Sequence, residues 1–365
     1  MNRFDHTFTP FNIRSLVIPN RIVFPPTVTG YSNPDGSVAH RQETFYRNIA
    51  KCRIGMVIVG ATAIAPEGVG WMGNTRIDRD EHVKGLSRLF DVIKAEGSVA
   101  GIQLYHAGSK TNTRRTGGID MVAPSAIEHP EGKGVPLELT LSEIHQLEEA
   151  FVKATERAFA AGTDFVEYHG AHGYLINQFL SPLFNKRTDE YGGSLENRAR
   201  FGLNIIKRAR EVVGTDPVIG IRISAVEFTE GGYPIEDSKK FCRWFVDEGI
   251  DFIDASAEMT PEGVAEMFKG RFIPLASSIK DVVNVPVICV GAIKSLERIE
   301  EILEQGHADL VAVCRALIAD PELITKTLNG KAEDITECVD CFECGTSIGE
   351  DDGDGMKCPQ NPDLP

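Results

Sequence analysis

Short apolar runs alternate with longer amphipathic segments along most of the chain. The apolar runs cover residues 21–24, 56–60, 100–104, 165–168, 218–223, 252–255, 287–290 and 310–313. Helical patterns cover residues 40–53, 82–96, 142–161, 195–213, 237–248, 272–283, 295–304 and 320–328. A short, continuous apolar run is typical of a strand that is buried on both faces of a parallel sheet. Eight such strands alternating with eight helices predict an α/β fold, a closed (β/α)8 TIM barrel.

Residues at the segment boundaries support this register. Polar pairs expected at helix amino termini stand at two boundaries, Ser142 with Glu143 and Ser295 with Glu297. Glycine adopts positive φ without steric cost, and it stands where five of the helices should end, at Gly97, Gly162, Gly214, Gly249 and Gly306.

The chain divides into a barrel, residues 1–330, and a cysteine-rich tail, residues 331–365. Segments 62–81 and 106–140 are longer than a barrel needs, and long loops at the catalytic end often cover the substrate. The tail contains an acidic, glycine-rich run at 349–355. We therefore do not expect the tail to fold by burying apolar surface.

The charge balance excludes some classes of partner. The chain has 53 acidic and 38 basic residues and a formal net charge of −15, which argues against nucleic acid or an anionic membrane as partner. It lacks an uninterrupted apolar run long enough to span a bilayer, and its first residues lack a signal-peptide pattern. We expect a cytoplasmic protein with a small-molecule substrate, and the sequence leaves a homo-oligomer open.

Three side chains able to hold or pass protons follow the fourth predicted strand: His169, His172 and Tyr174. The carboxyl ends of barrel strands are where such folds carry their chemistry. Two imidazoles can donate hydrogen bonds to one substrate oxygen while a phenol delivers a proton. Zinc binding is the competing interpretation, although the segment offers no third ligand close by.

Other strand ends carry polar groups that need partners. Gln103 lies in the third strand and Arg222 in the fifth, where a buried guanidinium requires an anionic or carbonyl-rich neighbour. The turn Pro25-Pro26-Thr27 could present a hydroxyl and backbone groups to a flat ligand.

A phosphate site is predicted after the last two strands. Gly291 and Ala292 follow the seventh strand, and Cys314 and Arg315 follow the eighth. Barrels commonly bind phosphate there, between loop amides and a short helix. These residues predict a phosphorylated cofactor.

The tail carries four cysteines with close spacing: Cys338, Cys341, Cys344 and Cys358, the last followed by proline. Cys-x2-Cys-x2-Cys with a distant Cys-Pro is typical of a 4Fe-4S cluster. A structural zinc site with four cysteine ligands is the alternative.

The chain resembles the old yellow enzyme family of FMN-dependent NADH:flavin oxidoreductases. The resemblance rests on QLYHAG at 103–108, VEYHGAHGYL at 166–175, QFLSP at 178–182 and RTDEYGGSLENR at 187–198. The cysteine tail is similar to that of the iron-sulfur branch, which contains 2,4-dienoyl-CoA reductase, enoate reductase and trimethylamine dehydrogenase.

The resemblance implies a role for each candidate residue. His169 and His172 would bind the substrate oxygen, Tyr174 would donate a proton, and the tail cysteines would hold a 4Fe-4S cluster. Non-covalent FMN would be lined by Pro25, Pro26, Thr27, Gly60, Ala61, Gln103 and Arg222, and its phosphate would be held by Gly291, Ala292 and Arg315, with Cys314 preceding that arginine.

The implied activity is that of an ene reductase, which transfers a hydride from reduced flavin N5 to an activated C=C bond. The substrate would be an α,β-unsaturated carbonyl, carboxylate or thioester. Relatives in the iron-sulfur branch continue into nucleotide-binding domains, whereas this sequence stops at Pro365. Electrons could therefore come directly from NADH or NADPH, or from a ferredoxin or flavoprotein through the cluster.

Two alternatives use the same cofactors. One is an amine dehydrogenase-like oxidoreductase of the same family. The other is an electron-transfer flavin and iron-sulfur subunit of a larger complex.

Overall fold

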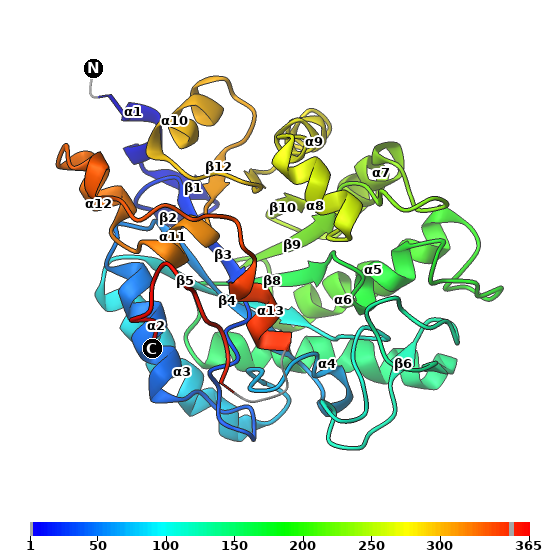
Figure 1. Cartoon of the computed structure of the whole chain (residues 1–365). Coiled ribbons are helices and arrows are strands. Elements are labelled where there is room, and N and C mark those ends of the chain that lie inside the picture. The colour runs from blue at the N-terminus through cyan, green and yellow to red at the C-terminus, as the bar shows by residue number, and fades with distance from the viewer. Residues whose placement is uncertain (1–2, 350–353) are drawn as a thin grey trace.

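The computed structural model describes residues 3–349 and 354–365, and its centre is a closed barrel of parallel strands. Around the barrel the order is β10-β11-β12-β3-β4-β5-β8-β9 (Figure 1). The strands are β3 (Ile22–Thr27), β4 (Met56–Ala63), β5 (Val99–Tyr105), β8 (Phe165–Gly170), β9 (Val218–Ser224), β10 (Phe252–Ser256), β11 (Val287–Cys289) and β12 (Leu310–Ala312). All eight predicted strands are confirmed, and so is the predicted TIM barrel.

The eight predicted helices also form, and they surround the barrel (Figure 1). They are α2 (His40–Ala50), α3 (Val83–Ala95), α4 (Leu141–Ala160), α6 (Leu195–Val213), α7 (Ile235–Glu248), α9 (Phe272–Lys280), α10 (Leu296–Glu304) and α12 (Leu323–Leu328). Short helices that the pattern did not predict are α1 (Asp5–Phe8), α5 (Leu175–Leu180), α8 (Pro261–Phe268), α11 (Arg315–Ala319) and α13 (Glu343–Gly349). None of the described helices is both long and apolar enough to cross a membrane.

The helix ends agree with the boundary signals except at one position. Ser295 caps α10 by accepting a hydrogen bond from the Arg298 amide, and all five predicted glycines have positive φ. The prediction of Ser142 as a cap was wrong, because Thr140 forms a capping box with Glu143 and α4 begins at Leu141. Leucine carries no competing side-chain hydrogen bond, so the helix extends back to the threonine.

Side chains of alternate residues point into the barrel and form layers. Phe165 and Phe252 fill the lower layer, and their rings meet edge to face at 5.7 Å. The strands beside these two carry glycine at the same level. A Cβ on Gly101 would lie 1.9 Å from the Phe165 ring, and one on Gly220 would lie 2.1 Å from the Phe252 ring. The lower barrel is therefore a packed core, and the cavity can lie only at the other end.

A hairpin closes the amino-terminal end of the barrel. It consists of β1 (Phe11–Ile13) and β2 (Leu16–Ile18), and its residues Ile13 and Ile18 pack against the interior apolar cluster. A second small pair, β6 (Val122–Ala123) with β7 (Leu137–Glu138), lies within the long loop 106–140.

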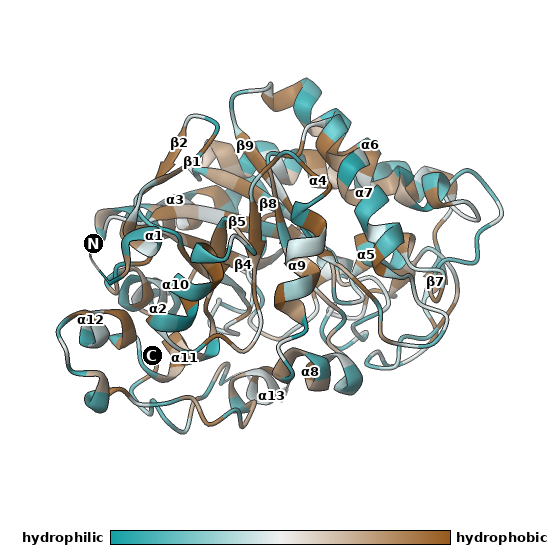
Figure 2. Cartoon of the chain, turned by 90° about the horizontal axis from the view of Figure 1, so that it is seen from above, coloured by the Kyte–Doolittle hydropathy of each residue, from teal (hydrophilic) through white to brown (hydrophobic). Residues whose placement is uncertain are grey.

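The tail returns along the barrel and passes beside α11 (Figures 1 and 2), and it bonds to this helix and to the loop that follows β3. The Met356 amide donates to the Thr29 carbonyl at 2.7 Å, and the Asn361 side chain donates to the Ile318 carbonyl at 2.8 Å. Ile348 and Met356 are buried against the barrel. The expectation that the tail buries no apolar surface was therefore wrong at these two residues. Most of the acidic run at 349–355 lies outside the described residues.

Candidate active site

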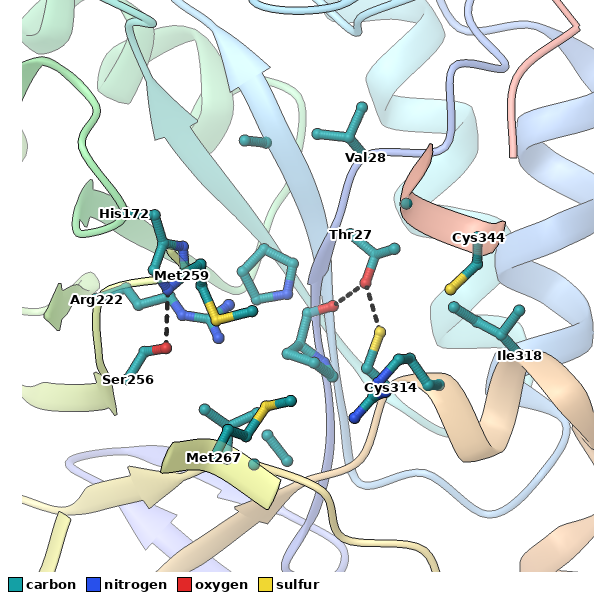
Figure 3. Close-up of a pocket in the computed structure, with 18 of the residues that line it drawn as sticks. Thr27, Val28, His172, Arg222, Ser256, Met259, Met267, Cys314, Ile318 and Cys344 are labelled. Carbon is teal, nitrogen blue, oxygen red and sulfur yellow. Dashed lines mark hydrogen bonds between the residues drawn. The ribbon is translucent and has the colours of Figure 1, made fainter. Parts of the chain in front are cut away.

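The carboxyl ends of the strands surround a cavity of about 350 Å³. Figure 3 shows its wall, with Thr27 at the end of β3, Val28 directly after it, Arg222 on β9 and Cys314 after β12. Every predicted cofactor residue except Gly60 lines the cavity, as do His169, His172 and Tyr174. Gly60 lies behind the wall, where its amide donates to the Tyr46 hydroxyl at 3.2 Å.

The two histidines and the tyrosine form one aromatic group. The His169 ring centroid lies 5.1 Å from that of His172 and 4.8 Å from that of Tyr174. His169 Nδ1 accepts a hydrogen bond from the Ala171 amide at 3.3 Å, which places the proton on Nε2. Within residues 3–349 and 354–365 no group bonds to that nitrogen, so the His169 N–H can serve a ligand in the cavity.

Burial sets the protonation of this group. Burial lowers the pKa of both imidazoles well below the ordinary value, and the charge of Arg222 lowers it further. Burial also raises the pKa of the Tyr174 phenol, although the ammonium of Lys110 opposes the shift. At neutral pH the site therefore holds two uncharged imidazoles and a phenol that keeps its proton.

Two serines hold His172. Its ring Nε2 bonds to Ser256 Oγ at 2.8 Å, drawn as a dashed line in Figure 3, and its backbone amide donates to Ser224 Oγ at 3.0 Å. His172 has a φ of +61°, a conformation that a non-glycine residue keeps only when its surroundings hold it. The serines lie two residues after Arg222 and Asp254 on their strands, so the barrel itself orients the imidazole.

Beneath the cavity a layer of buried polar side chains crosses four adjacent strands. Gln103 Nε2 donates to Glu167 Oε1 at 2.7 Å, and Arg222 Nε lies 3.3 Å from an Asp254 oxygen. Glu167 and Asp254 are both fully buried. Two carboxyls thus share one cation. Burial, and then the charge of Asp254, raises the pKa of Glu167 well above its usual range, so Glu167 is the one that keeps a proton.

A second buried network supports the His172 turn from below. The Gly173 amide donates to Asn177 Oδ1 at 2.6 Å, and Asn177 Nδ2 donates to the Tyr233 hydroxyl at 2.9 Å. The network ends at Glu227, which accepts from Ser181 Oγ at 2.8 Å. Burial raises the pKa of Glu227 to about 7.

We expect Glu227→Gln to flatten the pH dependence of stability. The pKa of Glu227 rises from 4.5 in the unfolded chain to about 7 in the fold, so the folded state binds the extra proton between these values. The free energy of unfolding of the wild type therefore falls by about 3 kcal/mol as pH rises through this window. Urea unfolding at pH 5 and pH 8 measures the fall, with exposed Glu230→Gln as the control. An equal fall in wild type and Glu227→Gln would contradict the assignment.

Basic side chains line the end of the cavity opposite Arg222. Arg315 begins α11, and Lys294 follows β11. Both contact the carboxylate of Asp340, and the Arg315 Nη1 to Asp340 Oδ1 distance is 2.8 Å. The region predicted to bind phosphate is thus cationic and carries a carboxylate from the tail.

The tail cysteines do not form a metal site in the described structure. Cys341 is exposed, and Cys338, Cys344 and Cys358 are half-buried. Burial, followed by the charges of Cys314, Cys358 and Cys338, raises the pKa of the Cys344 thiol to about 12. The part of the chain described here contains no grouping of three or more His, Cys, Asp or Glu residues that could bind a metal.

The cavity includes residues that the sequence analysis did not single out. Ser256 could have been found, because it lies two positions after Asp254 and therefore points to the same side of β10. The sequence did not indicate a place in the cavity for several others, among them Val28, Trp71, Met259, Met267, Phe272, Lys294, Asp340 and Phe342, and it indicated Cys344 only as a cluster ligand.

A parallel barrel with this cavity, basic at its phosphate end and lined by two histidines, is the architecture of a barrel enzyme that uses a phosphorylated cofactor. The chain belongs to the NADH:flavin oxidoreductase / NADH oxidase family, which matches residues 6–334. This is the old yellow enzyme family that the resemblance indicated.

Two relatives illustrate the family. The chain is 40% identical over 347 residues to an NADH oxidase of Thermoanaerobacter brockii, covering 93% of this chain and 53% of that one. It is 39% identical over 330 residues to an NADPH dehydrogenase of Bacillus licheniformis, covering 89% and 96%. The chain thus spans about half the length of the NADH oxidase and nearly all of the NADPH dehydrogenase.

Two solved structures match the tail as well as the barrel. A 2-naphthoyl-CoA reductase in complex with 2-naphthoyl-CoA has a TM-score of 0.93 and 28% identity, covering 99% of this chain and 57% of that one. A histamine dehydrogenase from Rhizobium sp. 4-9 has a TM-score of 0.86 and 28% identity, covering 100% and 53%.

Proposed function

We propose that this chain is an ene reductase that binds FMN without a covalent bond and reduces a C=C bond conjugated to a carbonyl, carboxylate or thioester. The observation that carries the proposal is the imidazole pair at the cavity wall, with the His169 N–H directed to no protein group that the structure describes. Uncharged N–H donors can polarise a conjugated carbonyl by hydrogen bonding to its oxygen, and a neighbouring phenol can then protonate the substrate.

The residues that line the cavity match the chemical groups of FMN. Its middle is largely apolar, Gln103 and Arg222 line one end, and Lys294 and Arg315 line the other. Among the described residues the Arg222 guanidinium pairs with Asp254 through Nε at 3.3 Å and makes no hydrogen bond, so its Nη groups would donate to a polar ligand edge. We assign the ring of FMN to Gln103 and Arg222 and its phosphate to the Arg315 end. Bound FMN supplies hydride transfer, which protein side chains cannot perform.

The protein groups supply orientation and the proton. His169 and His172 hold the carbonyl oxygen of the substrate by N–H donation and draw electron density away from the alkene. Tyr174 gives its phenolic proton to the α-carbon as the β-carbon gains hydride. The phenol is protonated across the physiological range because burial raises its pKa.

The test is a pair of half-reactions under anaerobic conditions. We expect NADH or NADPH to bleach the flavin absorbance of the holoenzyme, and an enone, enoate or enoyl thioester to restore it. The bound ligand of the 2-naphthoyl-CoA reductase makes an unsaturated acyl thioester the first substrate to try. If the protein binds FMN but no such acceptor restores the absorbance, the proposal fails.

Amine oxidation is the second candidate, because the histamine dehydrogenase structure matches the whole chain. An ammonium substrate would need free aromatic faces. Here Arg115 stacks on Trp71 at 5.0 Å, and Lys110 lies 5.3 Å from the Tyr174 ring centre. Protein cations thus occupy the faces that an amine would use. Bleaching of the flavin by an added amine without NADH would favour this candidate instead.

We also propose that the four tail cysteines bind an iron-sulfur cluster. This proposal rests on the type and spacing of the four ligands, not on their positions in the structure. Four thiols in this spacing suit a cluster, and two solved structures match this chain over the tail as well as the barrel. The described geometry does not gather the thiols, so no step of the reaction is assigned to the cluster. Iron and acid-labile sulfide analysis of anaerobically purified protein decides the question.

A further inference from the structure

We propose that Asp340 is a carboxylate competitor for the FMN phosphate, held in the phosphate end of the cavity until the cofactor displaces it. This inference rests on the proposed FMN site. Asp340 comes from the tail, between Cys338 and Cys341, and nothing in the barrel sequence points to it.

The contacts of Asp340 are those that a phosphate would make. Its Oδ1 accepts from Arg315 Nη1 at 2.8 Å, and its Oδ2 pairs with Lys294 Nζ. Arginine and lysine together on one anion are typical of phosphate recognition. Among the described residues that line the cavity, Asp340 is the only one with a carboxylate. It pairs with Lys294 and Arg315, two of the three cationic side chains there.

The tail segment is fastened by these contacts. Lys294 Nζ also donates to the Cys338 carbonyl at 3.0 Å, and the Phe342 ring lies 4.6 Å from the Arg315 guanidinium carbon. Asp340 and Phe342 have φ values of +57° and +61°, which non-glycine residues keep only where surrounding contacts impose them. Loss of the Asp340 ion pairs would therefore let the segment relax.

Asp340 and the FMN phosphate would compete for Arg315 and Lys294 through their negative charges. Asp340 and Arg315 are 25% and 16% exposed, so their attraction is only partly screened. A phosphate carries more negative charge than a carboxylate, and both cannot share the two cations without repulsion. FMN binding thus requires displacement of Asp340, which lowers the apparent affinity. Riboflavin has no phosphate and leaves Asp340 in place.

The experiment compares FMN and riboflavin binding by the full-length apoprotein. We expect Asp340→Asn to lower the dissociation constant of FMN roughly three- to tenfold and to change that of riboflavin less than twofold. Glu343→Gln removes a tail charge outside this contact and should change neither. An unchanged or weaker FMN affinity in Asp340→Asn, or an equal shift for riboflavin, would overturn the inference.

A second variant separates this inference from the proposed site. Arg315→Met should weaken FMN at least tenfold and spare riboflavin, because it removes the phosphate partner. If it does not, the proposed FMN site is wrong. Amide hydrogen exchange gives an independent readout: FMN, but not riboflavin, should speed exchange at residues 338–342. Equal exchange with both flavins would refute displacement even where the proposed site holds.

Discussion

Replacement of Arg222 by alanine is expected to destabilise the protein by about 3–5 kcal/mol, because it leaves buried Asp254 without its cation. Asp254 is fully buried, and neither of its oxygens has a hydrogen-bond partner within the described residues. Glu167, on the other side of the strand that carries Arg222, already keeps a proton. Urea unfolding of wild type and Arg222→Ala at pH 7 measures the loss.

Two further variants make this prediction specific. Arg222→Met with Asp254→Asn removes both charges and should recover most of the stability. Arg14→Met breaks a surface pair with Asp251, which Arg210 still holds, and should cost less than 1 kcal/mol. If the double variant is as unstable as Arg222→Ala, the uncompensated charge is not the cause.

The double variant also tests the role of Arg222 toward the flavin. With the cation absent, the flavin should be harder to reduce, and its midpoint potential should fall by roughly 40–90 mV. That range is the two-electron equivalent of about 2–4 kcal/mol. A folded double variant with an unchanged potential would show that Arg222 does not act on the ring.

The barrel could be predicted because its signals are local. Each strand is a short apolar run, and the glycines at helix ends have the positive φ that ends a helix. The short helices were missed for the same reason. Helix α8, for example, is eight residues long and buries only Gly263 and Met267, so it has no repeating apolar pattern.

The site was predictable where residues lie on strands and not where distant segments meet. His169, Arg222 and Gln103 lie at strand ends, so the closed barrel brings them together. Asp340 reaches Arg315 only because the tail folds back across the cavity, and no periodic pattern encodes that path. The cysteine spacing indicated a metal but not where the thiols would lie, since spacing along the chain does not specify convergence in space.

Loss of an imidazole from the His169 and His172 pair is expected to lower the rate of substrate reduction strongly. His172→Ala should lower kcat/KM for an enoyl substrate roughly 100- to 1000-fold, the usual cost of one donor to a developing oxyanion. FMN affinity should change less than threefold, since the phosphate end lies elsewhere in the cavity. Reduction of the flavin by NAD(P)H followed by acceptor titration separates the two half-reactions. His145→Ala, on the exposed face of α4, is the control.

Because Ser256 orients the His172 ring, we expect variants of these residues to lower kcat/KM by different amounts. Ser256→Ala removes the 2.8 Å hydrogen bond that orients the ring but leaves the imidazole, so we expect roughly a tenfold loss in kcat/KM. The double variant His169→Ala with His172→Ala should lower kcat/KM by less than the product of the two single effects, because both donors serve one oxygen.

Since the pKa of each imidazole lies well below its ordinary value, the wild-type rate should show no histidine ionisation between pH 6 and 8. Additive losses, or a titration near pH 6.5 that His172→Ala abolishes, would mean that the histidines act as separate charged groups instead of a neutral oxygen clamp.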